Sequence, residues 1–210
     1  MHSLDERWLS RRQLGCAASI RAMNPAPNLV LVGPMGAGKS SIGKRLAERL
    51  GLAFVDADRD VELRTGVAVG TIFECEGEAG FRARERAALA ERLASEGQLI
   101  ATGGGAVLDA DNRQHMRARG FVVYLQVDVA GQLERLARDR TRPLLQRDDR
   151  EDVLRQLAMA RAPLYADVAD LCFDTNGLAS GDAACQLGKL LVDRWQRSTA
   201  AALGQGPGQA

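Results

Sequence analysis

An eight-residue run near the N-terminal end constrains this chain more than any other feature. Residues 33–40 read Gly-Pro-Met-Gly-Ala-Gly-Lys-Ser, which fits the pattern G-x-x-x-x-G-K-[ST]. A short apolar segment, 29–32, precedes the run, and residues 39–50 continue it with apolar side chains at helical spacing until Gly51. The pattern therefore predicts a buried parallel strand that leads through a glycine-rich turn into a helix.

This turn has the chemistry of a phosphate site. Glycines let the backbone curl so that successive N–H groups face one point, and the positive end of the following helix also attracts an anion. We predict that Lys39 reaches the β- and γ-phosphates of ATP and that the Ser40 hydroxyl binds Mg²⁺. The residues predicted to line the nucleotide site are Gly36, Ala37, Gly38, Lys39, Ser40 and Ser41. A turn that binds nothing is the weaker alternative.

Strand and helix patterns alternate along the rest of the chain. Apolar segments suited to strands lie at 53–55, 99–101, 121–127 and 171–173, and helical patterns lie at 78–94, 129–138, 151–160 and 183–197. The alternation predicts one α/β domain, a three-layer P-loop NTPase fold with a five-stranded parallel sheet and helices on both faces. Ligands of such folds bind beyond the carboxyl ends of the strands, and three predicted strands end at Gly33, Asp56 and Gly103.

The domain is expected to cover residues 28–197. Residues 1–27 are polar and Arg-rich and end among prolines, so we predict a disordered extension and hypothesise that Met23 is the biological start. Residues 140–150 are too charged for a core and are predicted to form a small mobile lid. The Gly- and Ala-rich stretch 198–210 is predicted to be a disordered tail.

Composition excludes several classes of protein. Hydrophobic residues make up 46% and charged residues 26% of the 210 residues, and the net charge is +1, which argues against a broad nucleic-acid-binding face. The four cysteines are scattered without a C-x-x-C pair, so neither a zinc site nor a disulfide ladder is expected. Without a secretory signal or an apolar run of about 20 residues, a cytoplasmic protein that does not bind membranes is expected.

Residues beyond the turn narrow the kind of P-loop protein. No guanine-reading N-K-x-D segment is present, and the third apolar strand ends in glycines instead of the usual Walker B aspartate, so the second metal-side carboxylate must come from elsewhere. Asp56, at the end of a predicted strand, is the natural candidate for that carboxylate.

Six segments in order resemble the shikimate kinases, over about residues 28–178 and on toward the last helix. They are 33–40, Asp56-Ala57-Asp58 with Glu62, Phe81-Arg82 after Glu78, Gly103-Gly104-Gly105-Ala106, Arg142-Pro143-Leu144-Leu145 and Arg161-Ala162-Pro163-Leu164-Tyr165. The resemblance implies a fold of the nucleoside-monophosphate-kinase type. It also implies ATP-dependent phosphorylation of the 3-hydroxyl of shikimate, in aromatic amino acid biosynthesis, by an enzyme that works as a monomer.

The same resemblance implies roles on the acceptor side. Asp56 would hold Mg²⁺, and Asp58 would accept hydrogen bonds from substrate hydroxyls and take the proton of the attacking one. We expect both carboxylates on an extended strand end, two residues apart and facing one cleft. Arg82 and Arg161 would hold the substrate carboxylate, since guanidinium forks match its geometry.

Further implied roles fall on the glycine triplet and on two arginines. Gly103, Gly104 and Gly105 would let the backbone approach the substrate closely. Arg142 would close over the phosphates with the lid, and Arg135 would lie against adenine. Two rivals remain: another small-molecule kinase of the same fold, such as a gluconate kinase, and a kinase-like ligand sensor without turnover.

Overall fold

The centre of the molecule is a parallel sheet in which β2 (Asn28–Val32) is the middle strand. The computed structural model describes residues 24–137 and 149–197. Across the sheet the order is β3-β4-β2-β5-β6, with all pairs parallel. The other four strands are β3 (Ala53–Asp56), β4 (Gln98–Ala101), β5 (Gly120–Gln126) and β6 (Leu171–Asp174). The chain crosses to opposite sides of β2, so the loop after β2 lies at the switch point where ligands bind in such sheets.

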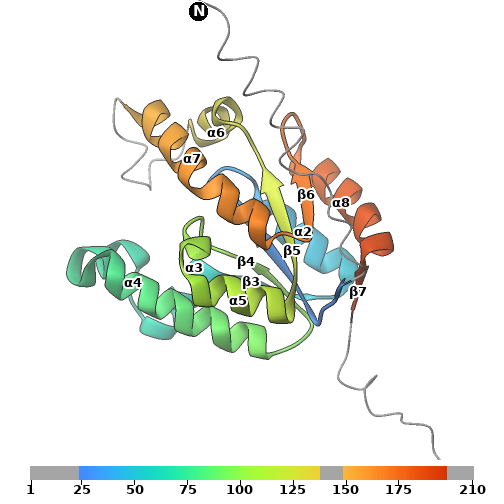
Figure 1. Cartoon of the computed structure of the whole chain (residues 1–210), viewed down its shortest axis with the longest axis horizontal. Coiled ribbons are helices and arrows are strands. Elements are labelled where there is room, and N and C mark those ends of the chain that lie inside the picture. The colour runs from blue at the N-terminus through green and yellow to red at the C-terminus, as the bar shows by residue number, and fades with distance from the viewer. Residues whose placement is uncertain (1–23, 138–148, 198–210) are drawn as a thin grey trace, which may run out of the picture.

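Helices cover both faces of this sheet (Figure 1). Successive side chains of β2 point to opposite faces of the sheet. On one face, Leu29 and Leu31 pack with α2 (Lys39–Leu50) and α8 (Ser180–Arg194). Val30 and Val32 pack on the other side, with helices α4 (Val69–Ala94), α5 (Ala110–Arg119) and α7 (Arg150–Val168). The three-layer P-loop fold with a five-stranded parallel sheet, predicted from the alternation, is confirmed.

A small substructure stands beside β3. It comprises α3 (Ala57–Thr65) and the N-terminal part of α4, which interrupts its helical geometry at Gly77 (φ 70°). A separate small core of Val61, Ile72, Phe81 and Ala88 holds the two helices together. After β4, the short 3₁₀ turn η1 (Ala106–Leu108) leads into α5, and α6 (Val129–Leu136) follows β5. Both α3 and α4 therefore border the carboxyl end of the sheet.

The two ends of the described chain meet in a second, two-stranded sheet. β1 (Asn24–Pro25) pairs in parallel with β7 (Trp195–Gln196). The Trp195 indole N–H donates to the Ala26 carbonyl at 2.9 Å, and Ala26 is buried in the main core. The composition had suggested a domain boundary at residue 28, but the described fold begins at Asn24. Prolines oppose a helix, yet they are tolerated in an edge strand such as β1.

Other elements show where pattern reading differs from the structure. Helices α3 and α5 were not predicted, because their stripes of buried residues are narrow and most of their residues are polar. The predicted helix 151–160 continues to Val168 through Pro163, whose ring lies on the exposed side while Tyr165 and Val168 are buried. The described residues contain no helix that is both long and apolar enough to cross a bilayer. The predicted lid, 140–150, lies almost wholly outside the described residues, as do the tail and residues 1–23.

Candidate active site

The loop after β2 is built so that its backbone amides are available to a ligand. Gly33, Gly36 and Gly38 all have positive φ, and a Cβ added to Gly33 would overlap the Leu125 carbonyl oxygen. Gly38 is the N-cap of α2 and offers no side chain to the first turn. The first-turn N–H groups of α2 are therefore left for an anion, as the sequence predicted for a phosphate site.

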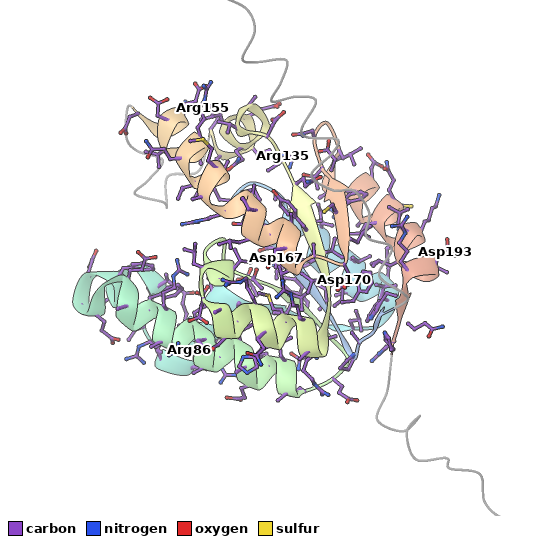
Figure 2. All side chains as sticks on the ribbon, viewed as in Figure 1. Arg86, Arg135, Arg155, Asp167, Asp170 and Asp193 are labelled. Carbon is purple, nitrogen blue, oxygen red and sulfur yellow. The ribbon has the colours of Figure 1, made fainter. Side chains whose placement is uncertain are left out.

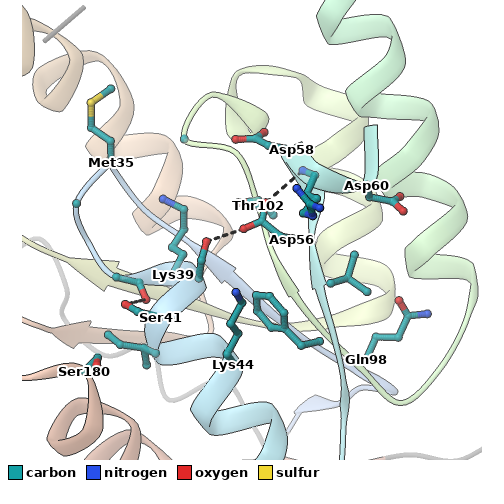
Figure 3. Close-up of a pocket in the computed structure, with 18 of the residues that line it drawn as sticks. Met35, Lys39, Ser41, Lys44, Asp56, Asp58, Asp60, Gln98, Thr102 and Ser180 are labelled. Carbon is teal, nitrogen blue, oxygen red and sulfur yellow. Dashed lines mark hydrogen bonds between the residues drawn. The ribbon is translucent and has the colours of Figure 1, made fainter. Parts of the chain in front are cut away.

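Lys39 and Ser40 are the first two residues of α2, and Figure 3 shows the Lys39 side chain at the start of this helix. The Lys39 ammonium donates to the Gly33 carbonyl at 2.8 Å and to the Pro34 carbonyl at 2.9 Å, so it braces the curled loop. The Ser40 hydroxyl donates to Asp56 Oδ2 at 2.6 Å. The predicted metal-side pair, Ser40 and Asp56, is thus brought together from two different strand ends.

The donor set around Ser40 and Asp56 fits Mg²⁺. One carboxylate and one hydroxyl are hard oxygen ligands, and Mg²⁺ keeps several waters and takes phosphate oxygens as further ligands. Among residues 24–137 and 149–197, no three His, Cys, Asp or Glu side chains gather into a metal-binding group. The protein alone does not form a complete cage, so an ion held here would depend on the nucleotide for part of its coordination.

Asp58 occupies a different setting from the one predicted. It lies in the first turn of α3 rather than on an extended strand end, because the Asp56 carboxylate caps the helix by accepting the Arg59 amide at 3.4 Å. Asp58 and Asp60 project to opposite sides of this helix start (Figure 3). Asp58 still lines the cleft together with Asp56, so the shared cleft is confirmed although its local structure differs.

Asp60, on the other side of α3, belongs to the framework. It is 4% exposed, and it accepts Arg64 Nε at 2.7 Å and Arg92 Nη2 at 2.5 Å. Burial alone would raise the pKa of Asp60, but the hydrogen bonds and charges of Arg92 and Arg64 outweigh it and hold the pKa below its ordinary value. This network fastens α3 to α4, and Asp60 and Arg92 also belong to the lining of the cleft.

Arg82 is anchored on α4 by two glutamates. Its guanidinium donates to Glu85 at 2.6 Å and to Glu78 at 3.1 Å, and it lies against the Phe81 ring. Glu85 is 1% exposed, and its Oε1 is buried without a hydrogen-bond partner among the described residues. Burial raises the pKa of Glu85 against the influence of Arg82, and the nearby Asp58 charge raises it further. The two glutamates therefore fix the position of the Arg82 guanidinium on α4.

The glycine triplet joins the parts of the site. A Cβ on Gly103 would lie 2.7 Å from Asp58 Oδ1 and 2.6 Å from Glu85 Oε1, and one on Gly105 would overlap the Arg82 guanidinium. The same test at Gly104 gives 3.8 Å to Arg161 Nη1 and 3.8 Å to the amide nitrogen of Met35 in the phosphate loop. Any side chain at Gly103 or Gly105 would displace a charged group, so the triplet lets all of these groups converge.

Arg135 lies on α6, close to the phosphate loop (Figure 2). Its Nη1 donates to the Gly36 carbonyl at 3.0 Å and to Thr175 Oγ1 at 3.0 Å, and its Nη2 donates to the Thr175 carbonyl. The guanidinium thus ties the phosphate loop to the turn after β6. The expected contact with adenine stays a prediction.

One cleft of about 1240 Å³ contains the groups of the phosphate loop together with Asp56, Asp58 and Gly104. Its lining includes Gly36, Gly38, Lys39, Ser40, Ser41, Asp56, Asp58, Gly104 and Arg135. The lining does not include Arg82, Arg161, Gly103 or Gly105, which lie next to Gly104 and Asp58. Ala37 is a buried residue of the loop, and its amide donates to the Pro34 carbonyl at 3.3 Å. Arg142 lies outside the described residues. Away from the cleft, Figure 2 labels exposed charges of both signs: Arg86 on α4, Arg155 and Asp167 on α7, and Asp193 on α8.

Three contributors were missed by sequence reasoning. Glu85 binds Arg82 from three residues further along α4, and its i,i+3 spacing was the available signal. Thr102 lines the cleft directly before the glycines, and its hydroxyl donates to the Leu31 carbonyl at 3.1 Å. Phe73 stacks on Phe81 with ring centroids 4.7 Å apart, a contact that only the packing of α4 creates.

Comparison with known proteins gives consistent results. A family model described as "Shikimate kinase" matches residues 35–191. A shikimate kinase of Stenotrophomonas maltophilia (strain R551-3) is 60% identical over 175 residues, which is 83% of this chain and 97% of the relative. A shikimate kinase of Xanthomonas campestris pv. campestris (strain 8004) is 57% identical over 177 residues, 84% of this chain and 98% of the relative.

Solved structures agree with these sequences. Shikimate kinase from Acinetobacter baumannii in complex with shikimate superposes with a TM-score of 0.77 at 45% identity, covering 83% of this chain and 97% of that one. Shikimate kinase from Aquifex aeolicus gives a TM-score of 0.69 at 30% identity, with coverages of 85% and 99%.

Proposed function

Because this chain belongs to the shikimate kinase family, we propose that its cleft transfers the γ-phosphate of ATP to the 3-hydroxyl of shikimate. The products are ADP and 3-phosphoshikimate, in the pathway to aromatic amino acids. The position of Gly104 carries the proposal. It lies beside both the phosphate loop and Arg161, so a phosphate donor and a carboxylic acid acceptor meet at one point.

The phosphate end holds the donor. The free amides of the loop and the positive end of α2 stabilise the phosphate charge, and Lys39 brings an ammonium to the β- and γ-phosphates. Mg²⁺, held by Ser40 and Asp56 together with the nucleotide, supplies neutralisation of the charge on the phosphate oxygens. Arg135 fixes Gly36 from the side of α6, and Arg142 is assigned to the closing lid.

The acid end holds the acceptor. Arg82 and Arg161 bind the carboxylate, and the Gly103–Gly105 backbone lies close to the ring. Asp58 accepts a hydrogen bond from the attacking hydroxyl and takes its proton as the oxygen–phosphorus bond forms. Phosphoryl transfer needs mostly positioning and charge neutralisation, which these groups supply.

The first test is ADP release by the purified full chain with Mg²⁺ and ATP. We expect stimulation by shikimate and none by gluconate or without acceptor. ATP binding without stimulation by shikimate would contradict the proposal and favour the sensor. Omission of Mg²⁺ should abolish turnover. We further propose a cytoplasmic monomer that binds small molecules and neither nucleic acid nor membranes, which sedimentation analysis and cell fractionation test.

A further inference from the structure

A buried phenol that the proposed function does not use lies at the acid end of the proposed site, next to Gly104. Tyr165 is 1% exposed and lies one helical turn after Arg161 on α7, so the two side chains share a face. Its ring packs against Tyr124 of β5, with centroids 5.1 Å apart. Its hydroxyl donates to the Gly104 carbonyl, 61 residues away in sequence. The contact joins α7 to the turn after β4.

The peptide that Tyr165 holds is unusually easy to reorient. It links two glycines, Gly104 and Gly105, which lack the Cβ atoms that restrict other residues, so rotation of the whole peptide plane meets little steric resistance. The bond is trans, as are all described peptide bonds. In a trans peptide the carbonyl and the following N–H point in opposite directions. The hydrogen bond to the Gly104 oxygen therefore also sets the direction of the Gly105 N–H, away from Tyr165.

The amides on this stretch have no other partner to hold them. Within the described residues, neither the Gly104 nor the Gly105 N–H donates to another protein group. The neighbouring carbonyls are engaged, since Gly103 accepts the Ala106 amide at 3.2 Å and Gly105 accepts the Leu108 amide at 3.0 Å. Two unpaired donors thus lie between Arg82 and Arg161, where an acidic ligand would place its oxygens.

We propose that Tyr165 is a positioning residue for the acidic substrate. By holding the Gly104 carbonyl it fixes the Gly104–Gly105 peptide with the Gly105 N–H available to a substrate oxygen, next to the two guanidinium groups. Tyr165 itself does not touch the substrate. The inference rests on the proposed function, because it assumes that the acid binds between Arg82 and Arg161.

The hydroxyl keeps the proton that this role requires. Burial raises the pKa of Tyr165 to about 12, against a smaller opposite effect of the Arg161 charge. The phenol is therefore neutral and able to donate throughout the range in which a kinase is assayed. Its contribution should not vary with pH between about 6 and 9.

The test is the Tyr165→Phe variant of the full chain, with Tyr124→Phe as the matched control. Tyr165→Phe keeps the ring and removes only the donor to Gly104, whereas Tyr124→Phe removes a phenol from the same cluster without touching that carbonyl. For Tyr165→Phe we expect shikimate KM and Kd to rise about 5- to 10-fold, as for loss of one hydrogen bond. The Kd of ATP, kcat and Tm should stay near those of the wild type, and the change in shikimate KM should be equal at pH 6.5 and 8.5.

Two results would overturn the inference. One is a Tyr165→Phe variant with wild-type shikimate affinity. The other is a loss of shikimate affinity matched in Tyr124→Phe, or accompanied by equal losses in ATP affinity and Tm, which would indicate general loosening. Calorimetric Kd values distinguish a failure of this inference from a failure of the proposed function. If the wild-type protein binds shikimate but does not phosphorylate it, the proposed reaction is wrong, and the Kd values of the two variants still test the role of Tyr165.

Discussion

The phosphate end and the acid end of the proposed site are constructed by different means. At the phosphate end, one contiguous loop and the first turn of α2 present backbone amides, with three glycines at positive φ. At the acid end, side chains from α3, α4 and α7 and the turn after β4 converge, and ion pairs with Glu78 and Glu85 hold Arg82. A backbone site needs only its local conformation, whereas a side-chain site depends on the packing of several elements. Substitutions at one end should therefore change the binding or catalytic constants that depend on that end and leave the ligand affinity of the other end unchanged.

Lys39→Ala should have the largest effect. It removes the ammonium from the phosphate end, and we expect kcat to fall about 10³-fold, because a charge that stabilises the transferring phosphate is lost. Shikimate Kd should change little, since the hydrogen bonds of Lys39 to the Gly33 and Pro34 carbonyls lie at the phosphate end. Steady-state ADP release and calorimetry measure the two quantities. A near-normal kcat would show that the phosphate assignment is wrong.

Asp58→Asn should give the converse result at the other end. The amide keeps the shape of the carboxylate but cannot take the proton, so kcat should fall about 10²- to 10³-fold. The Kd of ATP should change little, which separate nucleotide titrations would measure. An equal loss of ATP affinity would place Asp58 in the nucleotide site and remove the distinction between the two ends.

Glu85→Gln tests whether the acid end depends on its supporting charges. Arg82 would lose its buried anionic partner, and we expect shikimate KM to rise about 10-fold with the Kd of ATP unchanged. Glu78→Gln is the matched control, because Glu78 binds the same guanidinium but is 64% exposed, and its removal should change KM less than about 2-fold. An equal rise in shikimate KM for the two variants would contradict the stronger support that we assign to the buried Glu85.

Asp60→Asn should have the smallest effect on catalysis and a clear effect on acid stability. The folded-state pKa of Asp60 is lowered, so its stabilising contribution is present above its unfolded pKa of about 3.9 and is lost as pH falls through the lower folded value. In urea unfolding between pH 3 and pH 7, the variant should be less stable near neutrality and decline less steeply toward pH 3.

Asp193→Asn, which removes an exposed carboxylate on α8, should keep the wild-type pH profile. If Asp60→Asn kept it as well, the Asp60–Arg64–Arg92 network would not be what fastens α3 to α4.

Sequence alone predicted the strand, the glycine turn and the helix start that make up the proposed phosphate end. Residues 33–40 carry the strand end, the glycines and the helix start within one short segment, so local conformational preferences specify them together. The alternating pattern also predicted the parallel sheet, because apolar runs and helical stripes are local signals. Asp58 marks the limit: its membership of the cleft was predicted, but its place in a helix depended on capping by Asp56.

Only the tertiary structure decided how the acid end is assembled. Glu85 beside Arg82 and Tyr165 beneath Gly104 are contacts between side chains or between distant segments. The contact of Arg135 with Gly36 and Thr175 is of the same kind, although it lies at the phosphate end. Each residue taken alone in the sequence reads as an ordinary charged or aromatic helix residue. Their roles arise from burial and close approach, since a low-dielectric interior makes the choice of partner decisive, and burial is set by the packing of the whole chain.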